Sequence, residues 1–352
     1  MKIALVTDTH AGVRNDSDTF ADYQYKFWYD VFFPYLEEHN INHIIHLGDI
    51  TDRRKWINYK TLHRFRALIN KMANEYNLRV IIGNHDTYFK NTNEVNSMNC
   101  LFNKGFSTED LGGFQAYTQA TDMYIGTDKP ILFVPWINSG NLEHTLQAIG
   151  ESKADVCMGH LNLNGFEMAR GLYNTEGMDR KIFSKFDMVL SGHFHQRSHK
   201  DNIWYLGSPF EQTWIDHGEE RGFHTLDTET LDLEFIENPH KMFAKIFYDG
   251  NIADDVDVSN YTGMAVKIIV NQIDDQYLFN KFIEEMEAAD PWHMQIIDNT
   301  DVSNADDIEI EHIESKGTIE LLNDYIEQTK YDNKDEVKTL MRELFNEAIS
   351  SA

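Results

Sequence analysis

Cysteine is almost absent from this sequence. The two that occur, Cys100 and Cys157, have no C-x-x-C spacing and flank neither histidine pair. This scarcity argues against a disulfide framework and against a zinc site built from thiolates, and it favours a reducing compartment. We expect both thiols to be buried and chemically inert.

Long apolar runs are also missing. No run approaches the ~18 residues that a membrane-spanning helix needs, and no positively charged leader precedes a long apolar segment. We therefore expect no membrane association, no export and a cytoplasmic location.

Basic residues are outnumbered: 31 Lys and Arg stand against 58 Asp and Glu, for a formal net charge of −27. Positive charge supplies most non-specific nucleic-acid affinity, so this balance argues against a stand-alone DNA-binding protein. The acidic excess is greatest in residues 239–352, which carry 9 basic and 25 acidic residues, whereas residues 1–238 carry 22 and 33. Because bound divalent cations would neutralise several N-terminal carboxylates, a metal-dependent nuclease is not excluded.

What the sequence does contain is a repeated pattern: a short apolar run, then glycine, then a side chain that can bind metal. It occurs at His46-Leu47-Gly48-Asp49, Ile82-Gly83-Asn84-His85-Asp86, Met158-Gly159-His160 and Leu190-Ser191-Gly192-His193-Phe194-His195. A fifth run, Ile3–Val6, ends without glycine in Thr7-Asp8-Thr9-His10. Reactive groups gather at the carboxyl ends of strands in open α/β sheets, so we expect the five ends to converge.

The length of 352 residues and the 41% hydrophobic composition predict about two domains with a sizeable core. Strands at 2–7, 43–47 and 78–82 alternate with helices at 20–39 and 59–76, which predicts an α/β fold with parallel pairing. Pro34 is expected to kink or divide the first helix. Further strands are expected at 115–117, 123–125, 131–134, 154–158, 188–190, 203–206 and 223–226.

The chain is predicted to divide into four parts. Residues 1–238 carry the glycine-ended strands, and residues 239–298 read as a small α+β capping module with strands at 243–247, 265–270 and 293–297 and a helix near 277–288. Residues 299–316 read as an acidic linker, because the stretch Asp298–Ser315 has seven acidic residues and no Lys or Arg. Residues 317–352 contain two amphipathic helices, at 318–329 and 334–349.

The ligand types predict a dinuclear metal centre. Oxygen and imidazole donors without thiolate suit Mn²⁺, Fe²⁺ or Zn²⁺ better than Ca²⁺, and Asp49 is the natural bridging carboxylate. The other ligands divide into Asp8, His10 and His195 for one ion, and Asn84, His160 and His193 for the other. Two ions ~3.5–4 Å apart can clamp a phosphodiester and activate a water. His85 would remain free to face the scissile phosphate. Each motif alone has an ordinary structural explanation; five together make coincidence improbable.

The five motifs, Asp8-x-His10, Gly48-Asp49-x-x-Asp52, Gly83-Asn84-His85-Asp86, Gly159-His160 and Gly192-His193-x-His195, resemble those of the calcineurin-like metallophosphoesterases. That family folds as a two-sheet sandwich flanked by helices. Within it the chain resembles the SbcD-type double-strand-break repair nucleases, most closely the recombination endonuclease subunits of tailed phages. Further marks of this resemblance are Val134-Pro135-Trp136, residues 159–165, Gly207-Ser208-Pro209 and Arg221-Gly222-Phe223.

The resemblance implies a DNA exonuclease and endonuclease with two divalent ions, Mn²⁺ in particular, and with His85 as the catalytic histidine. It also implies a coiled-coil ABC-type ATPase partner of the SbcC type, which we expect at the C-terminal helices, a homodimer, and the host cytoplasm if a phage encodes the chain. One position departs from some relatives: Asp52 stands where they carry a second active-site histidine. A role for histidine there cannot be transferred.

Substrate contacts are expected around the metal centre, at Arg53, Arg54, Lys55, Tyr88 and Lys90, where cations and aromatics interleave. A solvated surface is the alternative. For the dimer interface, the candidates are Leu62, Phe65, Ile69, Met72, Met98, Leu101 and Phe102, which could equally be core residues.

Three functions remain open from the residues. The first is a DNA nuclease subunit, the second a phosphatase or cyclic-nucleotide phosphodiesterase, and the third a metal-free interaction scaffold. The intact ligand set argues against the scaffold. The capping module, linker and terminal helices favour the nuclease, because a small-molecule phosphatase has no obvious need for them.

Overall fold

The computed structural model describes residues 1–102, 113–169, 171–250 and 256–300, together with positions 334, 337 and 338. Most of the predicted linker 299–316 and of the predicted helical pair 317–352 lies outside these described residues.

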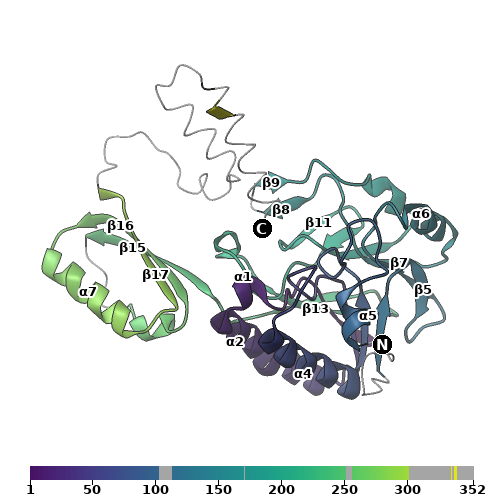
Figure 1. Ribbon diagram of the computed structural model, residues 1–352, viewed down its shortest axis with the longest axis horizontal. Helices are drawn as coiled ribbons and strands as arrows, with labels where there is room; N and C mark the ends of the chain where they lie inside the picture. The colour runs from purple at the N-terminus through teal and green to yellow at the C-terminus, as the bar shows by residue number, and fades with distance from the viewer. Residues whose placement is uncertain (103–112, 170, 251–255, 301–333, 335–336, 339–352) are drawn as a thin grey trace.

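Two six-stranded sheets form the main body of the protein (Figure 1). The first has the order β14 (Leu233–Glu237), β13 (Gly222–Asp227), β1 (Lys2–Val6), β2 (His43–His46), β3 (Asn77–Ile81) and β4 (Phe114–Tyr117). The second has the order β11 (Ser198–Lys200), β12 (Ile203–Tyr205), β10 (Met188–Gly192), β7 (Val156–His160), β6 (Pro130–Val134) and β5 (Thr121–Tyr124). Strands β1 to β4 pair in parallel, and so do β6, β7, β10 and β12. The predicted α/β sandwich is confirmed.

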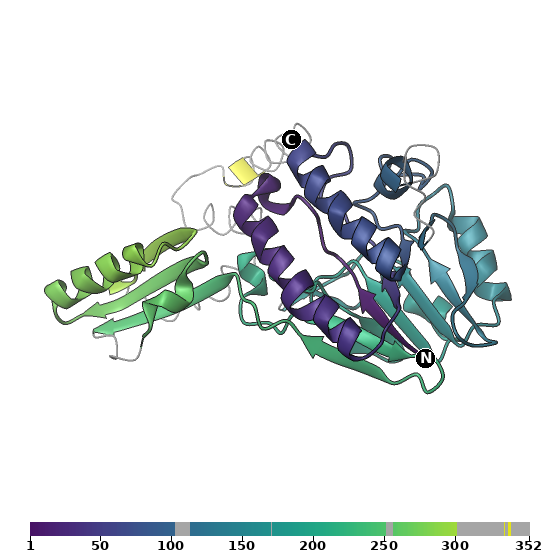
Figure 2. The same cartoon turned by 90° about the horizontal axis from the view of Figure 1, so that it is seen from below.

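Successive side chains of a strand point to opposite faces of the sheet, and this alternation gives each sheet an inner and an outer apolar layer. Ile3 and Leu5 of β1 point into a buried cluster that also contains Phe133 of β6 and Leu190 of β10, so this cluster is the core between the sheets. The intervening residues of β1 face outward, under α2 (Asp18–Lys26) and α4 (Tyr59–Glu75), which lie along that face of the first sheet (Figure 2). Helix α6 (Leu142–Glu151) packs on the outer face of the second sheet.

The predicted helix at 20–39 is divided in the structure. It comprises α2, the π-helical segment η1 (Phe27–Phe32) and α3 (Phe33–Glu38). Pro34 lies in the first turn of α3, a position that tolerates its missing N–H. Directly before it, the N–H of Phe33 donates to the carbonyl of Trp28, five residues back, and so shifts the hydrogen-bond register. The helix is thus divided by a change of hydrogen-bond register and not by a break in helical geometry, and the predicted kink or division at Pro34 itself stays a prediction.

Two sequence-based predictions need correction. Cys157 is buried as expected, but Cys100 is exposed. Most of the candidate dimer residues belong to the chain's own core: Phe65, Ile69, Met72, Met98 and Phe102 are all buried in the cluster beneath the first sheet's helices. The core alternative therefore holds for these five, and only Leu62 and Leu101 keep partial exposure.

Several short elements were not predicted. They are α1 (Val13–Asp16), α5 (Ser97–Phe102), α6, the hairpin β8 (Glu167–Ala169) and β9 (Leu172–Tyr173), the strands β11 and β14, and the 3₁₀ turns η2 (Arg180–Phe183), η3 (Trp214–Asp216) and η4 (Val258–Tyr261).

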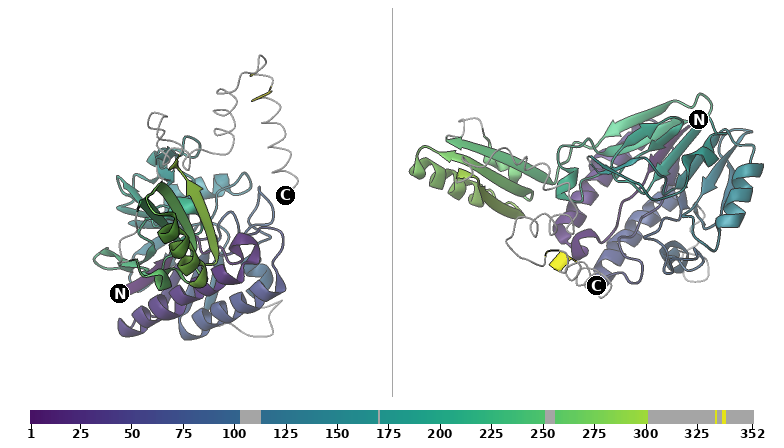
Figure 3. Two further views of the ribbon diagram at one scale, coloured as in Figure 1. Left: turned by 90° about the vertical axis from the view of Figure 1, so that its left-hand side faces the viewer. Right: turned by 90° about the horizontal axis from the view of Figure 1, so that it is seen from above.

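The segment after Pro239 forms a separate small sheet that projects from one side of the sandwich (Figures 1 and 3). Strands β15 (Phe243–Gly250), β16 (Ala265–Ile273) and β17 (His293–Asp298) are parallel, and α7 (Gln276–Ala288) packs on them through Phe282 and Met286. These elements match the predicted strands and helix. We call residues 239–298 the capping module; its status as a domain stays a prediction.

A buried carboxylate joins the capping module to the sandwich. Glu211 is 1% exposed, and its Oε2 accepts the N–H groups of Met242 (2.6 Å) and Phe243 (2.9 Å), where β15 begins. Burial raises the pKa of Glu211. Because the pKa of Glu211 is higher in the folded chain than in the unfolded chain, protonation of this side chain stabilises the fold. The stabilisation is complete below the unfolded pKa of about 4.3 and is lost as the pH rises through the folded pKa.

We therefore expect Glu211→Gln to remove this pH dependence. In thermal unfolding scans of the metal-free chain from pH 4.5 to pH 7.5, the unfolding temperature of the variant minus that of the wild type should increase as the pH rises. A constant difference across that range would contradict the prediction.

Candidate metal centre

The carboxyl ends of five strands meet at one end of the sandwich. Residues after β1, β2 and β3 come from the first sheet, and residues at the ends of β7 and β10 come from the second. Main-chain contacts hold the ends together: the N–H of Asp8 donates to the carbonyl of Gly48 at 3.0 Å, and Nδ1 of His160 lies 2.8 Å from the carbonyl of Leu47. The predicted convergence of the strand ends therefore occurs in the structure.

Asp8, His10 and His195 form the first cluster, in which one donor atom from each lies within 4.8 Å of the others. The Nε2 atoms of His10 and His195 face each other at 3.1 Å, a spacing compatible with two nitrogens bound to one ion. Among the described residues, Nδ1 of His10 is buried without a hydrogen-bond partner. Burial and the neighbouring His195 hold the pKa of His10 well below its usual value, which keeps it in the neutral form that binds metal.

Asp49, His160 and His193 form the second cluster, and Asn84 adjoins it. Nε2 of His160 lies 3.0 Å from Oδ1 of Asn84 and 3.3 Å from Oδ2 of Asp49. Because Nδ1 of His160 faces a carbonyl, which can only accept, Nδ1 carries a proton and Nε2 is the nitrogen that can bind metal. Despite the burial of His160, the adjacent Asp49 carboxylate raises its pKa to about 9, so Nε2 has to lose a proton when an ion binds. Burial lowers the pKa of His193 to about 3, so this imidazole is neutral.

Asp49 lies between the two clusters. Its Oδ2 is 3.3 Å from Nε2 of His160 and 3.8 Å from Nε2 of His10, and its Oδ1 accepts the N–H of His85 at 2.8 Å. Despite its burial, the charge of the adjacent His160 and the hydrogen bond with it hold the pKa of Asp49 below the usual range of a carboxyl. One carboxylate oxygen thus reaches both sets of nitrogens, which is the geometry a bridging ligand needs. The donor set fits two divalent ions.

Asp86 organises the loops that carry these ligands, a role the sequence did not reveal. Its carboxylate accepts the N–H groups of Asp49, Ile50, Thr51 and Gly83 at 2.9–3.1 Å, together with the hydroxyl of Thr51. Burial, with the nearby charge of Asp49, raises the pKa of Asp86 to about 6. The side chain joins the loop after β2 to the loop after β3 and so sets the distance between Asp49 and Asn84.

Glycine is required where these loops touch. A Cβ atom on Gly83 would lie 2.2 Å from Oδ1 and 2.3 Å from the backbone nitrogen of Asp49. A Cβ atom on Gly192 would lie 2.0 Å from Oγ1 of Thr7 and 3.0 Å from Oδ2 of Asp8. The glycine in the repeated sequence pattern thus leaves room for a ligand loop from a neighbouring strand.

We expect Gly83→Ala to displace Asp49 and to lower the amount of Mn²⁺ that the chain retains after dialysis, measured by elemental analysis. Gly150→Ala is the matched control, because the space around that glycine is open. Full retention of Mn²⁺ by Gly83→Ala would show that Asp49 does not hold metal in the place observed.

His85 stands at the edge of the first cluster. Its Nδ1 lies 2.6 Å from the carbonyl oxygen of Asp52 and therefore carries the proton, which leaves Nε2 as the nitrogen that can exchange one. Its ring meets that of His10 edge to face, with 4.8 Å between centroids. The carboxylate of Asp52, to which the sequence assigned no role, lies 3.8 Å from Nδ1 of His10. His10, Asp52 and His85 thus form a third group of donors.

The predicted substrate contacts divide into two kinds. Arg53 pairs with Asp16 at 2.5 Å and stacks on Trp56, and Arg54 donates to the carbonyls of Thr87 and Phe89. Both guanidinium groups therefore fasten loops of the chain itself, and their contact with a substrate stays a prediction. By contrast, the side chains of Lys55, Tyr88 and Lys90 are exposed.

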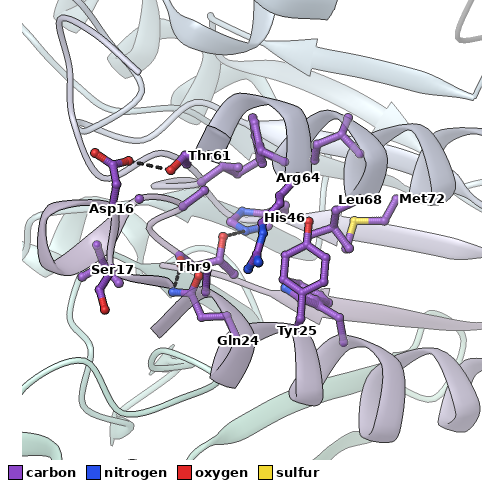
Figure 4. A pocket seen from close by; sticks show the side chains of 18 residues that line it. Thr9, Asp16, Ser17, Gln24, Tyr25, His46, Thr61, Arg64, Leu68 and Met72 are labelled. Carbon is purple, nitrogen blue, oxygen red and sulfur yellow. Dashed lines mark hydrogen bonds between the residues drawn. The ribbon is translucent and has the colours of Figure 1, made fainter. Parts of the chain in front are cut away.

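A pocket lies behind the loop that carries His10, between α2 and α4 (Figure 4). Polar contacts line its inner end: Oγ1 of Thr9 lies 2.9 Å from Nε2 of His46, and the amide of Gln24 donates to the carbonyl of Thr9. Its cavity volume is ≈ 40 Å³. One water needs roughly 10–15 Å³ of such volume, so the pocket has room for only a few waters and is too small for a nucleotide.

The family model for calcineurin-like phosphoesterases matches residues 1–197, which carry every proposed ligand. The chain belongs to this family. It is 30% identical over 332 residues to exonuclease subunit 1 of Enterobacteria phage T4, a match that covers 93% of this chain and 92% of the phage protein. It is 23% identical over 213 residues to the SbcD subunit of the nuclease SbcCD from Staphylococcus saprophyticus, covering 58% of this chain and 50% of that protein.

Among solved structures, an archaeal phosphodiesterase matches 68% of this chain and 100% of its own length at 16% identity and a TM-score of 0.34. In the part of the phosphoesterase that the structure describes, no helix has the length and apolar character to cross a membrane.

Proposed function

We propose that this phosphoesterase is the DNA exonuclease and endonuclease subunit of a DNA repair and recombination complex, with Mn²⁺ as its metal. The observation that carries the proposal is the pair of His and Asp clusters joined by Asp49 at the ends of five strands. The likeness to exonuclease subunit 1 supports a nucleic acid as the substrate, because it extends over 93% of this chain and so includes the capping module.

The proposed ligands are the seven named from the sequence. Asp8, His10 and His195 would hold one ion, Asn84, His160 and His193 the other, and Asp49 both. When bound, the two ions neutralise charge on the phosphate and lower the pKa of a water. His85, held through Nδ1 by the Asp52 carbonyl, would present Nε2 to the leaving oxygen and donate a proton to it. The exposed Lys55, Tyr88 and Lys90 would contact the strand.

The test is digestion of end-labelled duplex and single-stranded DNA with Mn²⁺ or Mg²⁺, alone and with the co-expressed ATPase. Bis-p-nitrophenyl phosphate and cyclic nucleotides run in parallel. We expect Mn²⁺-dependent cleavage of DNA. Turnover of the small substrates with none of DNA would instead support the phosphatase or cyclic-nucleotide phosphodiesterase alternative.

We further propose that the chain forms a homodimer, and that residues 317–352 dock a coiled-coil ABC-type ATPase of the SbcC type. The T4 and Staphylococcus saprophyticus relatives are both named as subunits, and this supports a partner protein for the chain. The amphipathic pattern of residues 318–329 and 334–349, behind an acidic stretch, suits an apolar face that lies in a groove of another protein.

Truncation after Ser315 should therefore separate docking from catalysis. The shortened chain is expected to keep Mn²⁺-dependent cleavage of short DNA, but to lose co-purification with the ATPase and any stimulation by ATP. Pull-down and digestion assays on the full and truncated chains measure both. Loss of basal cleavage would mean that the helices belong to the catalytic core; unchanged ATPase binding would place the docking site elsewhere.

A further inference from the structure

Two sequence motifs, Gly207-Ser208-Pro209 and Arg221-Gly222-Phe223, have no part in the ligand set. In the structure they bracket the connection between β12 and β13, which crosses from the second sheet to the first. The connection is unusually polar for a buried segment: Ser208, Gln212, Asp216 and Arg221 are each less than 5% exposed. Buried polar groups need partners, so the partners of these four indicate what the connection does.

Gln212 holds the main chain of a metal-ligand residue. Its amide Nε2 donates to the carbonyl oxygen of Asp8 at 2.7 Å. Asp8 has φ 53, a left-handed conformation that is unfavourable for a residue with a side chain and needs support from its surroundings. Gln212 is itself fixed, because its N–H donates to Asp216 and its carbonyl accepts from Arg14.

Arg221 holds a second ligand residue in the same way. One guanidinium nitrogen, Nη1, donates to the carbonyl oxygen of His195 and to the hydroxyl of Ser208, the latter at 2.9 Å. The other, Nη2, donates to Oδ1 of Asp216 at 2.8 Å. Asp216 therefore lies between Gln212 and Arg221 and joins them into one hydrogen-bonded group.

Both fastened carbonyls belong to the first cluster. Asp8 and His195, with His10, make up that cluster, whereas Asp49, His160 and His193 make up the second. The second cluster is instead fastened by Asp86, which holds the N–H of Asp49, and by the carbonyl of Leu47, which faces His160. The clusters also touch, because the N–H of His193 donates to the carboxylate of Asp8 at 3.1 Å, but the side chains of Gln212 and Arg221 hold main-chain carbonyls of the first cluster only.

We propose that Gln212 and Arg221 are positioning residues that set the affinity of the first cluster for its ion and affect the second cluster much less. The inference rests on the proposed metal centre and not on the identity of the substrate. Residues that orient metal ligands typically change metal affinity by about 10–100-fold when they are replaced.

The test is Mn²⁺ titration of the full chain without DNA, followed by electron paramagnetic resonance and calorimetry. The wild type is expected to bind two ions with spin coupling between them. Gln212→Leu removes the donor, and Arg221→Lys keeps the charge but loses the forked geometry. Each is expected to weaken the binding of one ion by about 10–100-fold, to weaken the binding of the other much less, and to lose the coupled signal at intermediate Mn²⁺.

Asn202→Leu is the matched control. Its amide also donates to two main-chain carbonyls, those of Phe183 and Phe186, but near the amino end of β10, away from the ligands. It should lower the unfolding midpoint and leave both Mn²⁺ affinities unchanged.

Equal weakening of both ions in Gln212→Leu and Arg221→Lys, or none, would overturn the proposal. Arg221→Lys, the milder change, decides the matter should Gln212→Leu fail to fold. A wild type that binds two ions but cleaves no DNA would overturn the proposed function and leave this inference standing.

Discussion

Asp49→Ala is expected to abolish DNA cleavage and to reduce the bound Mn²⁺ below two ions per chain, while the chain still folds. The reason is that Oδ2 of Asp49 lies within 3.8 Å of Nε2 of both His10 and His160, so a single substitution removes a ligand from both clusters. The fold should survive because the side chain lies at the end of the sandwich, where strand β2 has already ended. Elemental analysis, circular dichroism and digestion of labelled DNA measure the three outcomes.

The control must reproduce the backbone strain. Asp49 has φ 55, and Asp201 has φ 56, but Asp201 is exposed and pairs with Arg180 far from the ligands. Asp201→Ala therefore places alanine in the same left-handed conformation and should retain two ions and full cleavage. If Asp49→Ala retains two ions as well, Asp49 is not the shared ligand and the division into two clusters must be redrawn.

The strand ends could be predicted because their signal is local. Each apolar run, its glycine and its ligand lie within a few residues, and parallel pairing then brings the carboxyl ends of β1, β2 and β3 to one edge. A Cβ atom at Gly83 or Gly192 would lie too close to the neighbouring ligand loop, which explains why glycine belongs to the pattern. The same pattern predicted that the ends of β7 and β10 join those of β1, β2 and β3, but the division of the five strands between two sheets came from the family resemblance and had no local signal.

The supports of the site could not be predicted, because they act over long separations in sequence. Gln212 reaches the carbonyl of Asp8, 204 residues away, and Asp86 reaches the backbone of Asp49 across 37 residues. Each contact is made to a main-chain atom. Because every residue type has such atoms, the sequence of the held residue does not reveal the contact. Asp86, Ser208 and Arg221 stood in sequence motifs, and none of them had a role there.

Burial and pairing are likewise properties of the folded chain. The apolar stripe of α4 predicts a covered face but does not say what covers it, and α2 with its π-helical extension turned out to cover Phe65 and Ile69. The cations Arg53 and Arg54 looked free in sequence, yet Asp16, Thr87 and Phe89 engage them. By contrast, α6 was missed despite apolar residues at Leu142, Leu146 and Ile149 in helical spacing.

His85→Ala is expected to separate catalysis from metal binding. The substitution should leave two Mn²⁺ ions bound and slow DNA cleavage by about 10²–10⁴-fold, the range for loss of a general acid. The physical basis is the 2.6 Å contact that fixes Nδ1–H on the carbonyl of Asp52 and so makes Nε2 the nitrogen that transfers a proton. Exposed His144 on α6 supplies the control, and His144→Ala should behave as wild type.

The leaving group gives the sharper measurement for His85. A nucleotide oxygen leaves as a strong base and needs a proton, whereas p-nitrophenolate leaves without one. If His85 is the acid, His85→Ala should lose most of its rate on DNA and much less on the p-nitrophenyl ester of thymidine phosphate, both at saturating Mn²⁺. An equal loss on the two substrates would assign His85 to stabilising charge on the phosphate. A loss of bound Mn²⁺ would instead make it a ligand, together with His10 and Asp52, which lie within 4.8 Å of it.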